Sequence, residues 1–216
     1  MKIPVPHGHH EAQLKEPSGF IRGAAVLCHP HPLFGGTMHT KAVYRAAQAL
    51  NEIGLSVLRF NFRGVGASTG SYDAGIGERE DVTAALDWLE NNYPNLPLLV
   101  GGFSFGSMVG LAVGAEDKRV IALLGIGLVI GRGSGNHYDY TYLSDTGKPV
   151  LVVQGEEDEF GSGEQAEVLL AEFGKHITLM RVPGADHYFT EQLDALKGAI
   201  RDYYETDPMA CFFAAG

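Results

Sequence analysis

The sequence predicts an α/β fold in which a mostly parallel sheet carries helices on both faces. Two β segments near the N-terminus are followed by repeated β–α units, which is the pattern of such a sheet. The chain has 216 residues, 45% of them hydrophobic, which is enough for one substantial core and short for two. We therefore expect a single domain over residues 1–216.

The expected strands of the parallel part are short apolar runs bounded by glycine, proline or charged residues. They cover residues 24–28, 55–62, 98–101, 120–130, 149–155 and 177–183. Three stripes of apolar residues at helical spacing predict helices packed on the sheet, and we assign these stripes to the core rather than to a cofactor site. The stripes are Val82, Ala85, Leu86 and Leu89; Ala166, Leu169, Leu170 and Phe173; and Phe189, Leu193, Leu196, Ile200 and Tyr203.

A Gly-x-Ser-x-Gly motif centred on Ser104 lies between the apolar run 98–101 and the helix-compatible stretch 107–115. Strand, sharp turn and helix are the context in which a catalytic serine is held on a strained turn. The glycines at 102 and 106 permit a tight turn that projects the hydroxyl. The following helix start favours negative charge at the same place. The motif therefore predicts that Ser104 is a nucleophile rather than a structural turn serine.

A serine nucleophile needs a base, and the base needs an orienting acid. His187 follows the expected strand 177–183, so it lies at the same sheet edge as Ser104. The other downstream histidines fit less well, because His137 lies in a glycine-rich connection and His176 just precedes a strand. His187 is therefore the predicted base.

The predicted acid is Asp158, which follows the expected strand 149–155. Its short side chain can be held rigidly, whereas the neighbouring glutamates at 156, 157 and 159 are expected to be solvated loop or helix-entry charges. Asp186 adjoins His187 in sequence, but adjacent side chains diverge, so we expect it to cap a helix or face solvent. The order nucleophile, acid, histidine fits the strand–turn–helix serine motif.

Two backbone N–H groups are needed to stabilise an oxyanion. One is expected from Phe105, the residue after the nucleophile, and the other from the loop 29–37. The two prolines in that loop have no N–H. Leu33 is the first choice for the second donor, with His31 and Phe34 as alternatives.

No metal or cofactor is expected. His29 and His31 alternate with prolines and have no nearby cysteine or carboxylate, so their rings should form hydrogen bonds within the loop rather than bind a metal. The glycine-rich loop after residue 62 lacks the Lys-Ser/Thr pair of a phosphate-binding loop. Arg63 in that loop is expected to pair with Glu78 or Asp81.

Residues expected to line the substrate pocket are His31, Phe34, Phe103 and Tyr138, with Leu33 and Phe105 adding to a shallow apolar wall beside Ser104. Only the segment 131–148 separates the strand 120–130 from the next one, so a lid domain is not expected. The three tyrosines of that segment, at 138, 140 and 142, could line the cleft or pack against the sheet edge.

The net charge of −10 argues against nucleic acid or an anionic membrane surface as a partner. No apolar run approaches membrane-spanning length, and no signal-peptide core is evident near Met1. Cys28 and Cys211 are too few for a disulfide framework, so we expect a cytoplasmic location. The sequence does not indicate the oligomeric state. It also assigns no role to the apolar tail 208–213.

Taken in order, these motifs resemble the α/β-hydrolase superfamily, and more narrowly its small, capless bacterial serine hydrolases, a group related to the dienelactone hydrolases. The residues that carry the resemblance are His29-Pro30-His31-Pro32, Gly35-Gly36, Asn61 to Ser68, Gly102-x-Ser104-x-Gly106, Asp158 and Gly184-x-x-His187. The nucleophile here is serine, where dienelactone hydrolases have cysteine and the dehalogenase and epoxide hydrolase relatives have aspartate. The resemblance implies the α/β-hydrolase fold and esterase-type chemistry.

We therefore expect a serine hydrolase that cleaves small carboxylic esters with short acyl groups through an acyl-enzyme. A thioesterase, a lactonase or a peptidase could use the same three residues. A different class is a non-catalytic protein that binds a small molecule on this fold. A fluorophosphonate probe would distinguish that class, because only an active serine is labelled.

Overall fold

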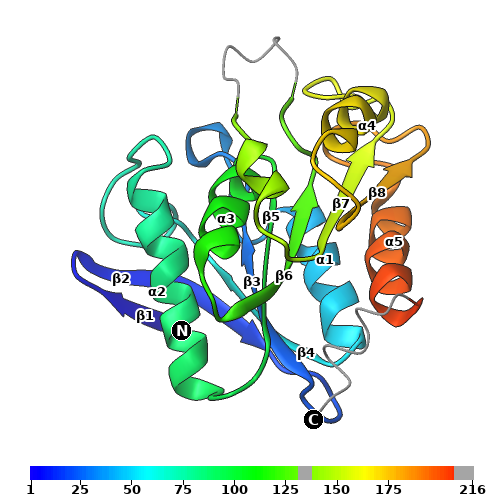
Figure 1. The fold of residues 1–216 in the computed structure, drawn as a ribbon. Helices are drawn as coiled ribbons and strands as arrows, with labels where there is room; N and C mark the ends of the chain where they lie inside the picture. The colour runs from blue at the N-terminus through cyan, green and yellow to red at the C-terminus, as the bar shows by residue number, and fades with distance from the viewer. Residues whose placement is uncertain (131–137, 207–216) are drawn as a thin grey trace.

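A computed structural model of the chain describes residues 1–130 and 138–206. Its strands form one eight-stranded sheet in the order β1-β2-β4-β3-β5-β6-β7-β8 (Figure 1). The strands are β1 Lys2–Val5, β2 Gly8–Lys15, β3 Gly23–Cys28, β4 Leu55–Phe60, β5 Leu98–Phe103, β6 Val120–Ile126, β7 Val150–Gly155 and β8 Ile177–Val182. The β1–β2 and β2–β4 pairs are antiparallel and the other neighbours are parallel, which confirms the predicted class.

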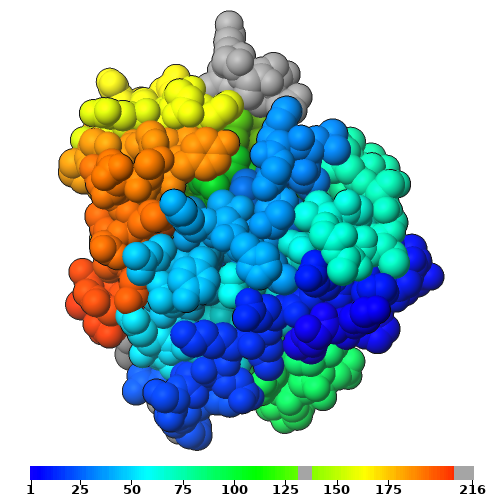
Figure 2. Space-filling model, turned by 180° about the vertical axis from the view of Figure 1, so that it is seen from behind, coloured from blue at the N-terminus to red at the C-terminus, as the bar shows by residue number. Residues whose placement is uncertain are grey.

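Helices cover both faces of the sheet. They are α1 Lys41–Glu52, α2 Gly77–Asn92, α3 Phe105–Glu116, α4 Gly163–Ala171 and α5 Leu193–Thr206, with short 3₁₀ segments at Pro32–Phe34 and Thr141–Ser144. Figure 1 shows α2 and α3 on one face, and Figure 2, seen from behind, shows α1 in light blue beside α5 in orange and red.

The side chains of β3 show how the two layers share the sheet. Ala24, Val26 and Cys28 pack in a core with residues of α2 and α3, while Ala25 and Leu27 pack in a second core with residues of α1 and α5. Every residue of β3 is buried. A strand with both faces covered has no polar side, and this explains why the parallel strands read as continuous apolar runs.

Two predicted elements end or begin elsewhere. The strand expected over 120–130 stops at Ile126, because Gly127 turns the backbone with a φ of 55°. The last helix begins at Leu193, so Phe189 is not part of it; Phe189 has a φ of 53° in the preceding turn and is nevertheless fully buried. Apolar spacing alone did not separate a buried turn residue from the helix that follows it.

Only residues 127–149 connect β6 to β7, too few for a lid domain, and this agrees with the prediction. Part of the connection, residues 131–137 with His137, lies outside the described residues, as does the tail 208–213 with Cys211. Of the tyrosines in the connection, Tyr140 is buried in the core. None of the helices within the described residues has the length and apolar character needed to cross a membrane.

A buried histidine joins the ends of β3 and β4, the two strands whose loops lead toward the site. His29 has no exposed surface, its Nδ1–H donates to the carbonyl of Pro30 at 2.6 Å, and its Nε2 accepts the N–H of Phe62 at 3.0 Å. Nε2 can accept only when it carries no proton, so the bond from Phe62 requires the neutral ring. Burial lowers the pKa of His29 from 6.5 to about 4.

This linkage predicts a loss of stability in mild acid. Below a pH of about 6.5 the unfolded chain binds a proton at His29, whereas the folded chain binds it only below about pH 4. The free energy of unfolding therefore falls as the pH drops through this window. Between about pH 7.5 and about pH 5 the contribution of His29 should fall by about 2 kcal/mol. Urea unfolding of wild type and His29→Gln at both pH values tests this. Equal pH dependence in the two proteins would contradict it.

Candidate active site

Ser104 lies on a strained turn between β5 and α3. Its backbone has a φ of 57° and a ψ of −120°, a conformation that residues with side chains rarely adopt. The turn is fastened to the end of β6, because the Ser104 N–H donates to the carbonyl of Ile126 at 2.9 Å and the Ser107 hydroxyl accepts the N–H of Ile126 at 3.0 Å. The strain is thus held in place by contacts beyond the turn itself.

Two glycines make the turn possible. A Cβ at Gly102 would collide with the carbonyl oxygen of Gly106, inside the turn. A Cβ at Gly106 would collide with the carbonyl oxygen of Cys28, at the end of the neighbouring strand β3. These glycines are therefore required by close backbone approach rather than by their own dihedral angles.

The structure brings together Ser104, His187 and Asp158 from three separate strand ends. His187 Nε2 lies 3.0 Å from Ser104 Oγ, and His187 Nδ1 lies 2.8 Å from Asp158 Oδ2. An ionised carboxylate only accepts, so Nδ1 carries the proton and donates, which leaves Nε2 of the neutral ring to accept from the serine. The three side chains are almost completely buried, with residue exposures of 8%, 2% and 3% for Ser104, His187 and Asp158.

The Asp158 carboxylate is fixed by two further donors. The backbone N–H of Phe160 donates to Oδ1 at 2.8 Å, and the side-chain amide of Gln154 donates to Oδ2 at 2.9 Å. Sequence reasoning did not find Gln154; its signal was one polar residue within the apolar run 149–155.

The neighbouring glutamates do not replace Asp158 at the imidazole ring. Glu156 pairs with Arg181 at 2.8 Å, and Glu157 is exposed. Glu159 is exposed as well, and its Oε2 accepts the backbone N–H of His187 at 3.3 Å, so it contacts the main chain of the histidine rather than the ring. The structure leaves Asp158 as the loop carboxylate in contact with the ring.

Asp186 has its own partner in the turn that follows the histidine. Its carboxylate accepts both the N–H and the hydroxyl of Thr190, at 2.9 and 2.7 Å. It therefore caps a turn that precedes α5 rather than the helix itself, and it is not in contact with the imidazole ring of His187.

The imidazole of His187 is packed among aromatic rings. Its centroid lies 4.6 Å from Phe160, 5.0 Å from Phe103 and 5.3 Å from Tyr188. Phe103 was expected to line the pocket, but it has no exposed surface and lies behind the histidine. As the last residue of β5 its side chain points into the layer of α1 and α5, so it supports the ring rather than the substrate.

In the loop after β3, the N–H groups of two of the three expected oxyanion donors already have acceptors. The Leu33 N–H donates to Nδ1 of its neighbour His31 at 3.2 Å, and the Phe34 N–H donates to the carbonyl of His31 at 3.1 Å. Among the hydrogen bonds of the described residues, neither the His31 N–H nor the Phe105 N–H has an acceptor. The 3₁₀ turn at Pro32–Phe34 therefore engages the N–H groups of Leu33 and Phe34. The His31 N–H is the expected alternative that stays available.

A hollow of about 560 Å³, here called the Ser104 hollow, opens at the serine. Its lining is largely apolar and aromatic: Pro30, His31, Phe34, Gly35, Gly36, Thr40, Ser104, Val129, Tyr138, Phe160, His187 and Tyr188. Three of the four predicted pocket residues, His31, Phe34 and Tyr138, therefore line it. Leu33 is exposed to 66% outside it and Phe105 is buried, so neither forms the expected wall.

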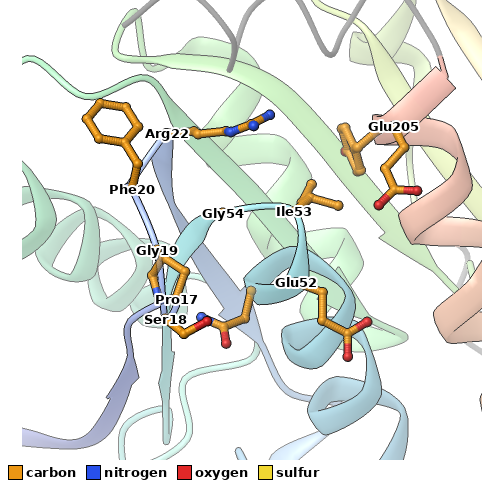
Figure 3. Close-up of a pocket in the computed structure, with 11 residues that line it drawn as sticks. Pro17, Ser18, Gly19, Phe20, Arg22, Glu52, Ile53, Gly54 and Glu205 are labelled. Carbon is orange, nitrogen blue, oxygen red and sulfur yellow. The ribbon is translucent and has the colours of Figure 1, made fainter.

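A second hollow of about 540 Å³ lies at the opposite edge of the sheet, where Arg22 precedes β3 and Gly54 precedes β4 (Figure 3). Figure 3 shows Phe20 at its rim and the acidic side chains of Glu52 and Glu205 on the other side. Among the described residues that line this hollow there is no histidine or cysteine. The Ser104 hollow, where a serine hydroxyl lies 3.0 Å from an imidazole nitrogen, is therefore the candidate reaction centre.

Among the described residues, one group of histidine and carboxylate side chains lies close enough together to be compared with a metal site. Both ring nitrogens of His29 are used in the hydrogen bonds described above. His7, His10 and Asp81 bring potential ligand atoms within 4.8 Å of one another. However, Arg63 donates to the Asp81 carboxylate from Nε at 2.9 Å and from Nη2 at 2.7 Å, and a cation would have to displace it. Of the two expected partners of Arg63, Asp81 is the one in contact with it, and Arg63 also pairs with Glu80 at 3.0 Å.

Comparison with known proteins identifies the family of the chain. The sequence matches the family profile described as an alpha/beta hydrolase domain over residues 24–197. An alpha-beta serine hydrolase homologue from Coxiella burnetii is 35% identical with a TM-score of 0.85, over 93% of this chain and 94% of that one. A serine hydrolase without a lid from Xanthomonas campestris is 34% identical with a TM-score of 0.85, over 95% and 92%. Est1E from Butyrivibrio proteoclasticus, solved with ferulic acid bound, is 20% identical with a TM-score of 0.80, over 95% and 98%, and shares the fold.

The close approach at Gly106 generates a stability prediction. Gly106→Ala would push a methyl group against the backbone of Cys28 and should destabilise the fold by more than about 3 kcal/mol. Gly198→Ala in α5 is the matched control, since nothing lies within 4 Å of the added methyl, and it should stabilise by about 0.5–1 kcal/mol. Urea unfolding measures both. A Gly106→Ala protein as stable as wild type would contradict the packing described for the turn.

Proposed function

Because the chain belongs to the alpha/beta hydrolase family, we propose that it is a serine hydrolase that cleaves carboxylic esters with short acyl groups. The observation that carries the proposal is the continuous hydrogen-bond path from Ser104 through His187 to Asp158, with distances of 3.0 and 2.8 Å. A buried serine next to an oriented neutral imidazole is an activated nucleophile, and acyl transfer is the chemistry it performs.

In the proposed reaction, Ser104 Oγ attacks the ester carbonyl while His187 Nε2 takes the hydroxyl proton. Asp158 holds the imidazole in the required tautomer and stabilises the imidazolium that forms. The proton then passes to the leaving alcohol, and an acyl-serine remains. Water attacks this intermediate by the same route in reverse and releases the acid. No metal or cofactor is needed for any of these steps.

We assign the oxyanion site to the backbone N–H groups of Phe105 and His31. Both lack an acceptor among the described residues, and both residues flank Ser104, one at the start of α3 and one in the lining of the Ser104 hollow. His31 thus replaces Leu33 as the proposed second donor. The His31 ring supports this arrangement, because its Nδ1 accepts the Leu33 N–H and its Nε2 lies 3.2 Å from the Tyr72 hydroxyl. Donors fixed in this way need no rearrangement as charge develops.

The shape of the Ser104 hollow supports a small, apolar acyl group. Its rim includes Phe34, exposed to 80%, and Tyr188, exposed to 50%, so apolar contact is available close to the serine. The connection from β6 to β7 is too short to place a lid domain over them. A long acyl chain gains binding energy only where protein covers it, about 0.8 kcal/mol per methylene. A small neutral ester is therefore the proposed substrate, and the low cysteine content supports a cytoplasmic location.

The first functional prediction concerns the three residues as a unit. Ser104→Ala and His187→Ala should each reduce esterase activity by about 10⁴-fold or more, and the double variant should lose little beyond either single one. Asp158→Asn should keep the fold but reduce kcat by up to roughly 10⁴-fold, because it favours the wrong imidazole tautomer. Kinetics on p-nitrophenyl acetate and labelling by a fluorophosphonate measure these effects.

Glu157→Gln is the control for the acid, since Glu157 is exposed on the same loop. It should retain wild-type activity. Additive losses at Ser104 and His187, or a severe loss in Glu157→Gln with none in Asp158→Asn, would contradict the assignment. A panel of thioesters, lactones and peptides in the same assay would identify a different acyl substrate for the same residues.

The second functional prediction concerns chain length. For p-nitrophenyl esters from C2 to C16, kcat/KM should reach a plateau or fall beyond about C6, since further methylenes project into water and add no transition-state binding. Activity should not rise at the monomer-to-micelle boundary of the substrate. An optimum at C12 or longer would show that a covered acyl channel exists and would overturn the short-acyl proposal.

A further inference from the structure

A glutamine lies buried behind the acid of the proposed reaction centre. Gln154 is on β7, four residues before Asp158, and has no exposed surface. We propose that Gln154 is a positioning residue that holds the Asp158 carboxylate in place for His187. This inference rests on the proposed esterase function and names a part of its machinery that the sequence motifs do not contain.

All the polar atoms of the Gln154 side chain are engaged. Nε2 donates toward Asp158 Oδ2 at 2.9 Å and toward the carbonyls of Gly161 and Leu128 at 2.6 and 3.2 Å. Oε1 accepts the N–H of Leu128 at 2.8 Å. The amide orientation follows from these partners, because only the NH₂ group can face three acceptors and only the oxygen can face the N–H.

The strand itself does not need a polar residue here. Val152 and Val153 precede Gln154 and are fully buried, and an apolar side chain would continue the same packing. Burying an amide is unfavourable unless each polar atom finds a partner. In this site the partners are two loop backbones and the carboxylate, so the amide serves the arrangement around Asp158 rather than the core.

The position of the amide suits a carboxylate that must stay still while charge moves. Oδ2 receives both the His187 Nδ1–H and the Gln154 amide, while Oδ1 receives the Phe160 N–H. Three donors in fixed directions prevent the carboxylate from rotating away when the imidazole takes the serine proton. Because Gln154 is neutral, it supports the ionised carboxylate without a cation that would compete with the imidazolium.

The decisive variant is Gln154→Glu, which keeps the acceptor for the Leu128 N–H and removes only the amide donor. The introduced carboxyl group faces Asp158 and two carbonyls, so its pKa should be raised. When protonated it can donate as the amide does; when ionised it repels Asp158. The variant should therefore lose activity as the pH rises through the pKa of the introduced carboxyl group. Wild type has no carboxyl group at position 154 and should show no such loss as the pH rises.

Gln154→Met tests the same contact without a new charge. It matches the length of glutamine but cannot donate, so kcat should fall by roughly 10- to 100-fold with little change in KM, as expected when a catalytic group loses its orientation. Glu157→Gln, an exposed change on the same loop, is the control and should keep the wild-type kcat and pH profile. Thermal unfolding at each pH shows whether activity is lost while the protein is still folded.

A falling alkaline limb in Gln154→Glu, seen below its unfolding temperature and absent from wild type and Glu157→Gln, would support the proposal. Wild-type pH profiles and kcat values in both Gln154 variants would overturn it and leave the esterase assignment intact. Loss of activity that only parallels unfolding would also overturn it, because the role would then be structural. If wild type neither hydrolyses esters nor reacts with a fluorophosphonate, the proposed function fails, and this inference fails with it.

Discussion

The architecture of the site depends on the strained turn at Ser104. A side chain held at a φ of 57° persists only where surrounding contacts leave the chain no relaxed alternative. Here the contacts come from both neighbouring strands: β3 approaches Gly106 through the carbonyl of Cys28, and β6 receives the Ser104 N–H at the carbonyl of Ile126. This turn points the Ser104 hydroxyl toward the His187 ring, and α3 begins at the next residue. It also leaves the Phe105 N–H without an acceptor among the described residues.

Neutral polar side chains brace the loops around that turn. His29 ties the end of β3 to the loop after β4, and Gln154 ties the loops after β6 and β7 to Asp158. Both are fully buried and fully bonded, so they fix loop geometry without adding charge to the centre. The Asp158 carboxylate is thus the charged group in contact with the His187 ring. In the proposed reaction the proton passes from Ser104 to His187 among polar groups whose positions are already fixed.

Much of this molecule could be predicted from local sequence patterns. Buried parallel strands are apolar on both faces, so their runs identify them without any partner being known. The strand–Gly-x-Ser-x-Gly–helix context locates the turn at Ser104, and the rule that parallel strands end at one edge relates it to Asp158 and His187. These inferences succeed because they rest on backbone geometry and chain order, which the sequence contains directly.

The finer features of the site were decided only by tertiary structure. Leu33 was a reasonable oxyanion donor until the 3₁₀ turn directed its N–H to the His31 ring and left the His31 N–H with no acceptor in the described part of the chain. Phe103 was expected in the cleft, yet it is buried and packs behind His187. The buried Gln154 lies in an apolar strand, and no local pattern marked it as part of the site. Sequence alone therefore determined the fold class, the sharp turn at Ser104 and the order of the candidate residues. Which N–H is available, which ring faces substrate and which amide holds the acid depend on contacts between segments far apart in the chain, and no local pattern encodes those partners.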